Sequence, residues 1–434
     1  MDPIMIGLVG VAVMVALLLC GIPIAFAMGL VGYAGLVVVS NVTAANSVVA
    51  SIPYDIISDY NFCVLPLFVL MANICFYNQF GKNLFDLTDK WMGRLPGGLA
   101  AATIGSCAIF GAVSASILAT SLTIGLVAIP EMRRYKYDAT LATACVASGG
   151  VLGVLIPPSS IFIIYGIMTE QSIGELFISG IVPGIVLAIM FMIMILIRAK
   201  INPTWAPPGP RWSIREKMSS LVSCIDVFLL IALSIGGLIV GWFTPTEAGG
   251  IGSFGAIVLS LIRRRLSWQA FKKSIVETVL SSAMIYLLLI GAMVFNAFLT
   301  LSTLPMEMAN IVTAFKLPPY AVISMIILIY LIMGCFIDAM AMILLTIPAF
   351  YPVVTALGYD PIWFGVIIVM VTGLGTITPP VGMNVYVIAG IAPDVPMGKI
   401  FRACVPFVII ELLFCLLIIA FPQIILFLPR LVLR

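Results

Sequence analysis

The sequence Gly-Val-Leu-Ile-Pro-Pro-Ser-Ser at positions 153–160 decides how this chain folds. It lies inside a long apolar run, and its two adjacent prolines interrupt any helix there because proline has no N–H group to donate. A second copy, Gly-Thr-Ile-Thr-Pro-Pro-Val-Gly at 375–382, interrupts another apolar run in the same way. The sequence therefore predicts two broken helices.

The composition around these breaks is that of a membrane protein. Of the 434 residues, 62% are hydrophobic and 9% are charged, whereas a soluble domain is about half apolar and about a quarter charged. Since a helix needs about 20 apolar residues to cross a bilayer, the apolar runs predict about ten crossings, the last of them at 403–428. We therefore expect an all-α polytopic membrane protein and exclude a soluble multi-domain enzyme.

Several kinds of chemistry are missing from the chain. It has no histidine, so neither Ser-His-Asp hydrolysis nor a histidine-ligated zinc site can be built from this subunit alone. It has no Walker motif for ATP hydrolysis, and its nine cysteines form no CxxC pair. A net charge of +3 gives no reason to expect a nucleic-acid partner. These features predict that the chain is not an enzyme.

The two breaks belong to a longer internal repeat. They are 222 residues apart (379 − 157 = 222), and the same offset relates Pro23 to Pro245 without a gap. We therefore divide the chain into a first repeat (1–197), a proline-rich cytoplasmic linker (198–224) and a second repeat (225–434). An odd number of crossings in each repeat would turn the second copy upside down, and inverted repeats are typical of secondary transporters.

Two further segments are longer than one crossing and shorter than two. They are 97–129 and 319–354, and each precedes a broken helix, at 139–168 and 361–391 respectively. Both loops around the first segment are basic, whereas the loops around the second contain one basic residue, Lys316. Because cytoplasmic loops collect Lys and Arg, we predict two helical hairpins that enter the membrane from opposite sides, the first from the cytoplasm.

Each break is a candidate cation site. The prolines leave the carbonyls of Gly153 and Val154 without helical partners, and those of Gly375 and Thr376 likewise. A single break of this kind is most simply a kink that neighbouring helices or hydroxyls repair. Two symmetric copies, each facing a hairpin tip, favour a dehydrated cation such as Na⁺. The sequence therefore predicts two Na⁺ sites related by the internal two-fold.

Polar residues at the tips and just after the breaks are the candidates for substrate contact. Ser116 lies in the first tip, and Ser159 and Asn384 follow the breaks. Asp338, in the second tip, either caps the second half of its hairpin or contacts a substrate or ion, because an ionisable group inside a membrane segment needs a partner. No Lys or Arg falls in mid-membrane. Helix N-termini, hydroxyls and bound cations would therefore have to balance an anionic substrate.

The chain resembles the large membrane subunit of tripartite ATP-independent periplasmic (TRAP) transporters. The similarity extends along nearly the whole chain. The matching stretches are GIPIAFAMG (21–29), GRLPGGL (93–99), VLIPPSSIFIIYG (154–166), TEQSIGELFISGIVPG (169–184), FTPTEAG (243–249), MGCFIDAMAMILLTIP (333–348) and TPPVGMNVYVIAGI (378–391).

This resemblance implies a sodium-coupled importer in the lipid of a bacterial inner membrane. Its expected partners are a small TRAP membrane subunit and a soluble periplasmic substrate-binding protein that delivers an organic acid. The resemblance also implies an elevator, in which hairpins and broken helices move as one block within a fixed scaffold. The implied Na⁺ ligands are, for one site, Ser114, Gly153, Ile156 and Pro157, and, for the other, Gly334, Gly375 and Thr378.

The first tip departs from the pattern of many relatives, which have Ser-Gly-Ser where this chain has Ser114-Ala115-Ser116. The substrate is therefore left open between two classes, C4-dicarboxylates and sialic acids. The alternative function is that of a membrane permease subunit in an ATP-driven importer. Dependence on Na⁺ without a requirement for ATP would distinguish the two.

Overall fold

The computed structural model describes residues 2–314 and 318–432, so Lys316 lies outside the described residues. Every regular element in these ranges is helical, which confirms the all-α fold. In chain order, the elements are α1 (Pro3–Leu19), α2 (Ile24–Val39), α3 (Val42–Ser58), η1 (Tyr60–Cys63), α4 (Val64–Tyr77), α5 (Phe80–Met92), α6 (Gly98–Ser114), α7 (Ile117–Arg134), α8 (Ala139–Gly150), α9 (Leu152–Leu155), α10 (Ser160–Thr169), α11 (Ile173–Ile201), α12 (Ile214–Ser223), α13 (Ile225–Ile231), η2 (Ala232–Gly236), α14 (Gly237–Ile239), α15 (Pro245–Ile262), α16 (Trp268–Leu301), α17 (Leu304–Ala314), α18 (Pro319–Gly334), α19 (Ala339–Ala356), α20 (Pro361–Gly375), α21 (Met383–Ile391), α22 (Met397–Ala420) and α23 (Gln423–Val432).

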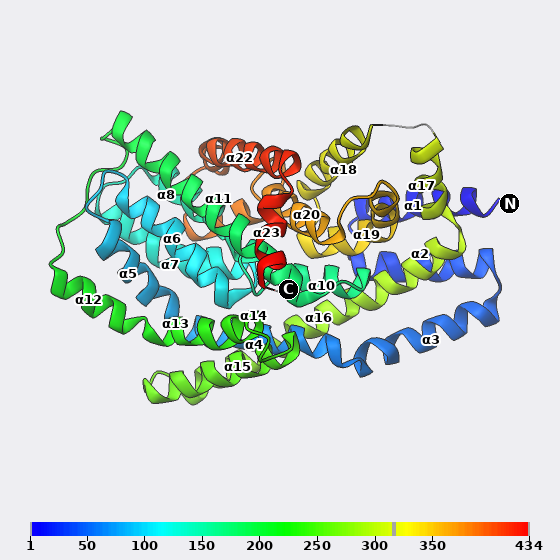
Figure 1. Cartoon of the computed structure of the whole chain (residues 1–434), viewed down its shortest axis with the longest axis horizontal. Helices are drawn as coiled ribbons and strands as arrows, with labels where there is room; N and C mark the ends of the chain where they lie inside the picture. The colour runs from blue at the N-terminus through cyan, green and yellow to red at the C-terminus, as the bar shows by residue number, and fades with distance from the viewer. Residues whose placement is uncertain (1, 315–317, 433–434) are drawn as a thin grey trace.

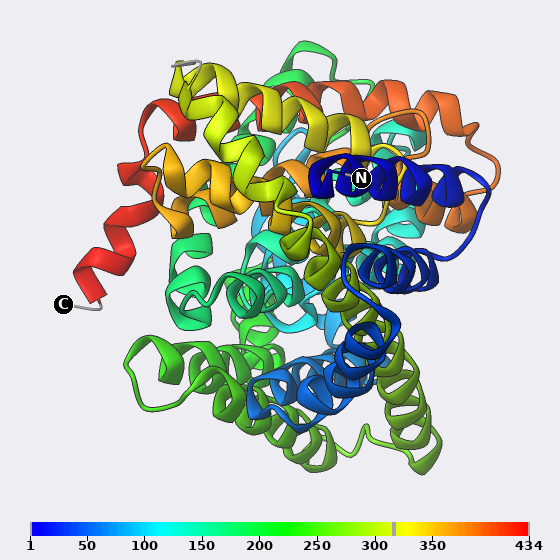
Figure 2. The same cartoon turned by 90° about the vertical axis from the view of Figure 1, so that its right-hand side faces the viewer.

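The helices form two groups. Helix α16 packs against α2, α3 and α4, and α4 packs against α15. Figure 1 shows this group along one long side of the molecule, continued by α12 and α13. Helices α6 to α8, α11, α20 and α22 lie on the other side, and Figure 2 shows the C-terminal α23 extending away from them. We call the first group the scaffold.

Each predicted hairpin contains two helices joined by a short tip. In the first, α6 ends at Ser114 and α7 begins at Ile117, with Ser116 as the cap that accepts a hydrogen bond from the N–H of Ala119 (3.4 Å). Ala115, between them, has a φ of 53°, a conformation that glycine adopts more easily. In the second, Asp338 caps α19 by accepting from the N–H of Met340 (3.0 Å). The structure thus gives Asp338 the capping role.

The chain breaks at both Pro-Pro sequences. After the first, α10 begins with Ser159 as its cap, which accepts from the N–H of Phe162 (3.3 Å). Before the second, α20 ends at Gly375, and α21 begins only after Gly382, whose φ is 56°. The peptide bond between the two prolines is cis in each break.

The linker is fastened to the base of the first hairpin. The N–H of Gly97 donates to the carbonyl of Ala206 (2.9 Å), and the N–H of Gly209 donates to the carbonyl of Gly93 (2.8 Å). A third backbone bond joins the N–H of Asp138 to the carbonyl of Trp205 (3.0 Å). The first half of the linker therefore follows the hairpin base.

Two helix predictions differ from the structure. The predicted last crossing at 403–428 is wrong, because α22 ends at Ala420 and α23 begins at Gln423. Pro422 lies between them, and the residue before a proline is disfavoured in a helix. The apolar runs also do not predict α3, α5 and α17, because these helices contain too many polar residues.

The helix lengths fit a multi-pass membrane protein. Within the described residues, seven helices are long and apolar enough to cross a bilayer, and the bent pair Ile214–Ser223 and Ile225–Ile239 makes an eighth if it counts as one span. Six shorter apolar helices, of 10 to 17 residues, include α1, α2 and α20. Large apolar side chains such as Leu19 and Trp268 are exposed, as expected for a surface that faces lipid.

Candidate functional site

The first hairpin tip rests directly on the first break. A Cβ atom added to Gly111, in the tip, would lie 2.8 Å from the Cα of Gly153, so the two backbones are in contact. The hydroxyl of Ser160, just after the prolines, donates to the carbonyl of Ala115 in the tip (3.0 Å). Glycine at both positions is what allows this approach.

The second tip rests on the second break in a matching way. A Cβ atom added to Gly375 would lie 2.6 Å from the Cα of Gly334, which ends the first arm of the hairpin. The N–H of Val381, just after the prolines, donates to the carbonyl of Cys335 in the tip (3.2 Å). The structure therefore brings together the predicted residues Gly334 and Gly375, as it brings the first tip to Gly153.

Oxygen atoms cluster where the first tip meets the break. The hydroxyl oxygens of Ser114 and Thr120 are 2.6 Å apart, and the Thr120 hydroxyl donates to the carbonyl of Ser116 (2.8 Å). A Cβ atom on Gly153 would collide with the Thr120 hydroxyl and would lie 2.8 Å from the Ser116 carbonyl oxygen. Ser114 and Thr120 are both buried. The Thr120 hydroxyl and the Ser116 carbonyl thus face Gly153, and the Ser114 hydroxyl bonds to the first of them.

Thr120 was not among the predicted site residues. It lies one helical turn after Ser116 on α7, and positions four residues apart share one face of a helix. That spacing is the signal that could have found it. A threonine inside an apolar helix is otherwise read as a packing residue whose hydroxyl bonds back to the preceding turn.

The break itself also contains carbonyl groups without helical donors. Ile156 is buried, and its N–H donates to the carbonyl of Leu152 (2.9 Å), which closes the last turn before Pro157. The carbonyls of Gly153 and Val154 precede the prolines by four residues, so no helical donor reaches them. Outside the helices, no described residue donates to either carbonyl.

The second break does not have two free carbonyls, and that prediction is wrong. The carbonyl of Gly375 accepts from the N–H of Thr378 (3.2 Å), and the carbonyl of Thr376 accepts from the N–H of Asn384 (3.0 Å). The first bond is a turn that closes before the prolines, and the second forms because the chain turns at Gly382 and returns the N–H of Asn384 to the end of α20. The Thr378 hydroxyl donates to the carbonyl of Leu374 (2.8 Å).

No carboxylate or thiolate cluster accompanies either break. In the ranges that the structure describes, no group of three His, Cys, Asp or Glu side chains is arranged to hold a metal ion. A cation at these breaks would therefore depend on hydroxyl and carbonyl oxygens. Oxygen ligands of this kind suit a hard cation such as Na⁺.

The four candidates for substrate contact occupy different environments. Ser159 and Asn384 are fully buried, and the side chain of Asn384 donates to the carbonyl of Ala147 (2.5 Å), which ties α21 to α8. Ser116 caps α7 at the first tip. Asp338 lines a cavity of about 950 Å³ between the second tip and the scaffold. Of the four, Asp338 alone lines this cavity.

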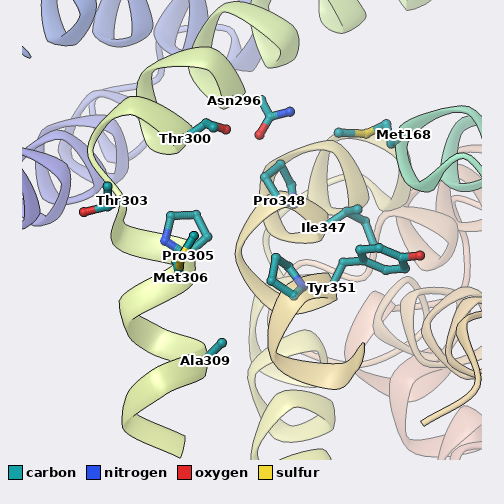
Figure 3. Close-up of a pocket in the computed structure, with 11 residues that line it drawn as sticks. Met168, Asn296, Thr300, Thr303, Pro305, Met306, Ala309, Ile347, Pro348 and Tyr351 are labelled. Carbon is teal, nitrogen blue, oxygen red and sulfur yellow. The ribbon is translucent and has the colours of Figure 1, made fainter. Parts of the chain in front are cut away.

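A second, smaller cavity lies farther along the second hairpin. It measures about 390 Å³ and is lined by residues of α19, of the end of α16 and of the start of α17. Figure 3 shows Asn296 and Thr300 on one wall, with Pro348 and Tyr351 on the other. Two cavities therefore lie between parts of the second hairpin and the scaffold, although α19 also contacts α16 and α17 directly.

Comparison with known proteins supports the resemblance. The family model for the tripartite ATP-independent periplasmic transporter, DctM component, matches residues 11–424. The C4-dicarboxylate TRAP transporter large permease protein DctM of Pseudomonas aeruginosa is 34% identical over 372 residues, 86% of each chain. The sialic acid TRAP transporter large permease protein SiaM of Vibrio cholerae is 31% identical over 416 residues, 96% of this chain.

Among solved structures, MtrF of Neisseria gonorrhoeae, described as one of a class of antimetabolite efflux pumps, has a similar fold. Its TM-score is 0.61 at 13% identity, covering 86% of this chain and 82% of MtrF. That likeness concerns the fold alone. The family match covers almost the full length, and the relatives are transporters rather than enzymes. This chain therefore belongs to the TRAP transporter family as its large membrane component, a multi-pass protein of the bacterial inner membrane.

Proposed function

We propose that this chain imports an organic acid by coupling its movement to Na⁺. TRAP transporters work with a substrate-binding protein and often with a small membrane subunit. In this proposal, a periplasmic binding protein delivers the acid to the chain, and the small subunit is its membrane partner. The relatives named for C4-dicarboxylates and for sialic acid make these the first two substrate classes to test.

The paired tip-and-break contacts are the observation that carries the proposal. Each tip meets its break through a glycine pair, Gly111 with Gly153 and Gly334 with Gly375. The first contact gathers buried hydroxyl and carbonyl oxygens, which are ligands suited to a dehydrated Na⁺. We propose one Na⁺ site there and a second at the matching contact, with the ligands that the resemblance implies.

The arrangement of the helices favours an inverted repeat. Shifting the bounds of α2 by 222 gives 246–261, and α15 covers Pro245–Ile262. Shifting α11 by 222 gives 395–423, and α22 covers Met397–Ala420. This correspondence supports the division into repeats at 1–197 and 225–434.

An elevator mechanism is consistent with the same contacts. Hydrogen bonds join each tip to its own break, so the two can move together. The cavities between the second hairpin and the scaffold leave room for relative movement there. We therefore propose that tips and breaks travel as one block past the scaffold.

The test is uptake by proteoliposomes that contain this chain and the small subunit, with the binding protein outside. We expect uptake that requires an inward Na⁺ gradient, is unaffected by ATP, and is absent when K⁺ replaces Na⁺. Liposomes that contain this chain alone should take up nothing. Robust uptake without the partners would show an ordinary secondary transporter, and a requirement for ATP would favour the permease of an ATP-driven importer.

A further inference from the structure

The second half of each broken helix packs against the hairpin of the other repeat. Helix α21, which follows the second break, packs against α7 of the first hairpin, and α10, which follows the first break, packs against α19 of the second. A Cβ atom added to Gly125 on α7 would lie 3.2 Å from the side chain of Ile391 on α21. Just after α10, the side chain of Gln171 donates to the hydroxyl of Tyr351 on α19 (3.1 Å). Each proposed Na⁺ site therefore lies beside helices of both repeats.

One residue, Asn384, is bonded to both broken helices. Its backbone N–H donates to the carbonyl of Thr376 in the second break (3.0 Å). Its side-chain amide nitrogen donates to the carbonyl of Ala147 on α8, in the first broken helix (2.5 Å). Asn384 is fully buried. Two hydrogen bonds of a single residue thus connect the second break to the helix that leads into the first.

The carbonyl of Ala147 is available to Asn384 because α8 ends early. In a continuing α-helix, the N–H of Val151 would donate to Ala147, but it donates to the carbonyl of Ser148 instead (3.3 Å). The last carbonyls of a helix need donors from elsewhere, and Asn384 supplies this one from the second repeat. The next turn, α9, contains Gly153 of the first proposed Na⁺ site. Asn384 therefore fixes the helix end that positions this site.

The packing around Asn384 leaves little freedom for independent movement. A Cβ atom added to Gly150, at the end of α8, would overlap the hydroxyl of Ser121 on α7 and would lie 2.8 Å from the amide nitrogen of Asn384. Ser121 directly follows Thr120, whose hydroxyl faces the first break. Helices α7, α8 and α21 thus meet at Gly150, and close-packed elements transmit small shifts to one another.

The side chain of Asn384 is not needed to form a break. Subtracting 222 from 384 gives 162, and Phe162 is a fully buried apolar residue after the first break. The amide oxygen of Asn384 is buried and accepts from no group among the described residues, which is an unfavourable arrangement that an apolar side chain would avoid. The distinctive contribution of this side chain is its bond to Ala147.

We propose that Asn384 is a positioning residue that couples the two proposed Na⁺ sites, so that an ion bound at one break raises the affinity for Na⁺ at the other. An ion at the second break holds the segment that carries Asn384, and the amide of Asn384 then holds the end of α8 beside the first site. Coupling between two binding sites is reciprocal. This inference rests on the proposed function and deepens it, because it states how the two sites act together.

The experiment measures equilibrium binding of radioactive Na⁺ to the purified chain together with its small subunit in detergent. We expect the parent to bind two ions with a Hill coefficient above unity, which independent sites cannot give. Asn384→Leu has a side chain of similar size but no donor. It should still bind two ions, with a Hill coefficient at or below unity and a half-saturating Na⁺ concentration raised about 5-fold or more.

Two further variants separate this role from a general loss of rigidity. Asn73 is the control, because its side chain donates to the hydroxyl of Thr278 (3.0 Å) and so joins α4 to α16 within the scaffold. Asn73→Leu should keep the parental binding curve. Gly150→Ala disturbs the amide of Asn384 from the side of α8 and should also lower the Hill coefficient. It carries the test if Asn384→Leu is not monodisperse in size-exclusion chromatography.

The outcomes separate this inference from the function on which it rests. A parent that binds two Na⁺ ions without cooperativity would overturn the inference and leave Na⁺ coupling in place. A parental Hill coefficient in Asn384→Leu or in Gly150→Ala would also overturn it, as would an equal loss of cooperativity in Asn73→Leu. A parent that binds no Na⁺ would contradict the proposed function itself, and the inference with it.

Discussion

The first and second breaks have a similar backbone arrangement, but different oxygen atoms surround them. At the first, the Thr120 hydroxyl faces the break and bonds to the Ser114 hydroxyl, and among the described residues outside the helices nothing donates to the carbonyls of Gly153 and Val154. At the second, backbone N–H groups already occupy the two corresponding carbonyls. Adding 222 to 120 gives 342, and Met342 places a methyl group 3.5 Å from a Cβ on Gly334. Two repeat-related contacts can thus share a backbone arrangement and still differ in the oxygen atoms that a cation would meet.

The largest expected effect comes from filling the glycine contacts. We predict that Gly153→Val and Gly375→Val each abolish Na⁺-driven uptake, because a Cβ at either position meets the opposing tip. The test is uptake with saturating binding protein, with size-exclusion chromatography to confirm folding. Gly250→Ala is the control, since a Cβ there has no neighbour within 4 Å. Parental uptake by either valine variant would show that tip and break need not touch.

The hydroxyls of the first cluster should govern its affinity for Na⁺. We predict that Ser114→Ala and Thr120→Val raise the Na⁺ concentration for half-maximal uptake about 5- to 150-fold, the effect of losing about 1 to 3 kcal/mol of ligand interaction, while the maximal rate changes less. Thr120→Ser should restore most of the affinity. Thr123→Val is the control, because Thr123 lies on the same helix and its hydroxyl bonds to the carbonyl of Ala119 (2.6 Å).

At the second break, loss of a hydroxyl should matter less. We predict that Thr378→Ala weakens the apparent affinity for Na⁺ by less than about 5-fold. Its hydroxyl bonds to the carbonyl of Leu374 one turn earlier, whereas the Thr120 hydroxyl also bonds to the Ser114 hydroxyl and lies against Gly153. The same uptake titration measures it, side by side with Ser114→Ala. If the two variants shift the Na⁺ curve equally, the contrast between the breaks has no functional meaning.

The smallest effect concerns the base of the first hairpin. Burial and the nearby carboxylates of Glu131 and Asp86 raise the pKa of Asp89, on α5, to about 6, against an ordinary value of 3.8. A raised carboxyl pKa means that the folded state binds the proton more tightly, so stability falls as pH rises from about 4 to 6. We predict that Asp89→Asn raises the free energy of unfolding by about 1 to 2 kcal/mol above pH 6, after allowance for solvent screening.

Thermal unfolding in detergent at pH 5 and at pH 7 tests this prediction. The variant should be more stable than the parent at pH 7, and the difference should shrink at pH 5. The second half lacks this carboxylate, because adding 222 to 89 gives position 311, which is Ile311 on α17. A gain that is the same at both pH values would mean that the charge of Asp89 is not its cause.

The sequence predicts the breaks and hairpins well because their causes are local. A proline removes its own N–H wherever it lies, and Ser116 and Asp338 cap the helices that follow them. Hydropathy also finds most of the membrane helices. It misses α3 and α5, which have polar faces and do not form uninterrupted apolar runs.

The contacts that could not be predicted depend on the path that the chain takes after each motif and on how neighbouring helices pack. Whether the carbonyl of Thr376 is free depends on the turn at Gly382, which returns the N–H of Asn384 to it. The place of Thr120 in the first cluster depends on how α7 is rotated against the break. Asn384 follows a break in sequence, and yet its side chain donates to a carbonyl of α8 and does not line the cavity beside the second tip. These contacts depend on the tertiary structure, which local sequence patterns do not predict.

The bonds between the linker and the first hairpin set a limit on travel. The last bonded linker residue is Gly209, and α12 begins five residues later at Ile214 (214 − 209 = 5). A fully extended chain spans at most about 3.6 Å per residue, so these five can reach about 18 Å. The hairpin base can therefore move no farther than this from the start of α12 unless the hydrogen bonds between the linker and the hairpin base break. In the proposed elevator, the length of this linker segment would therefore limit the stroke, as the thickness of the membrane does.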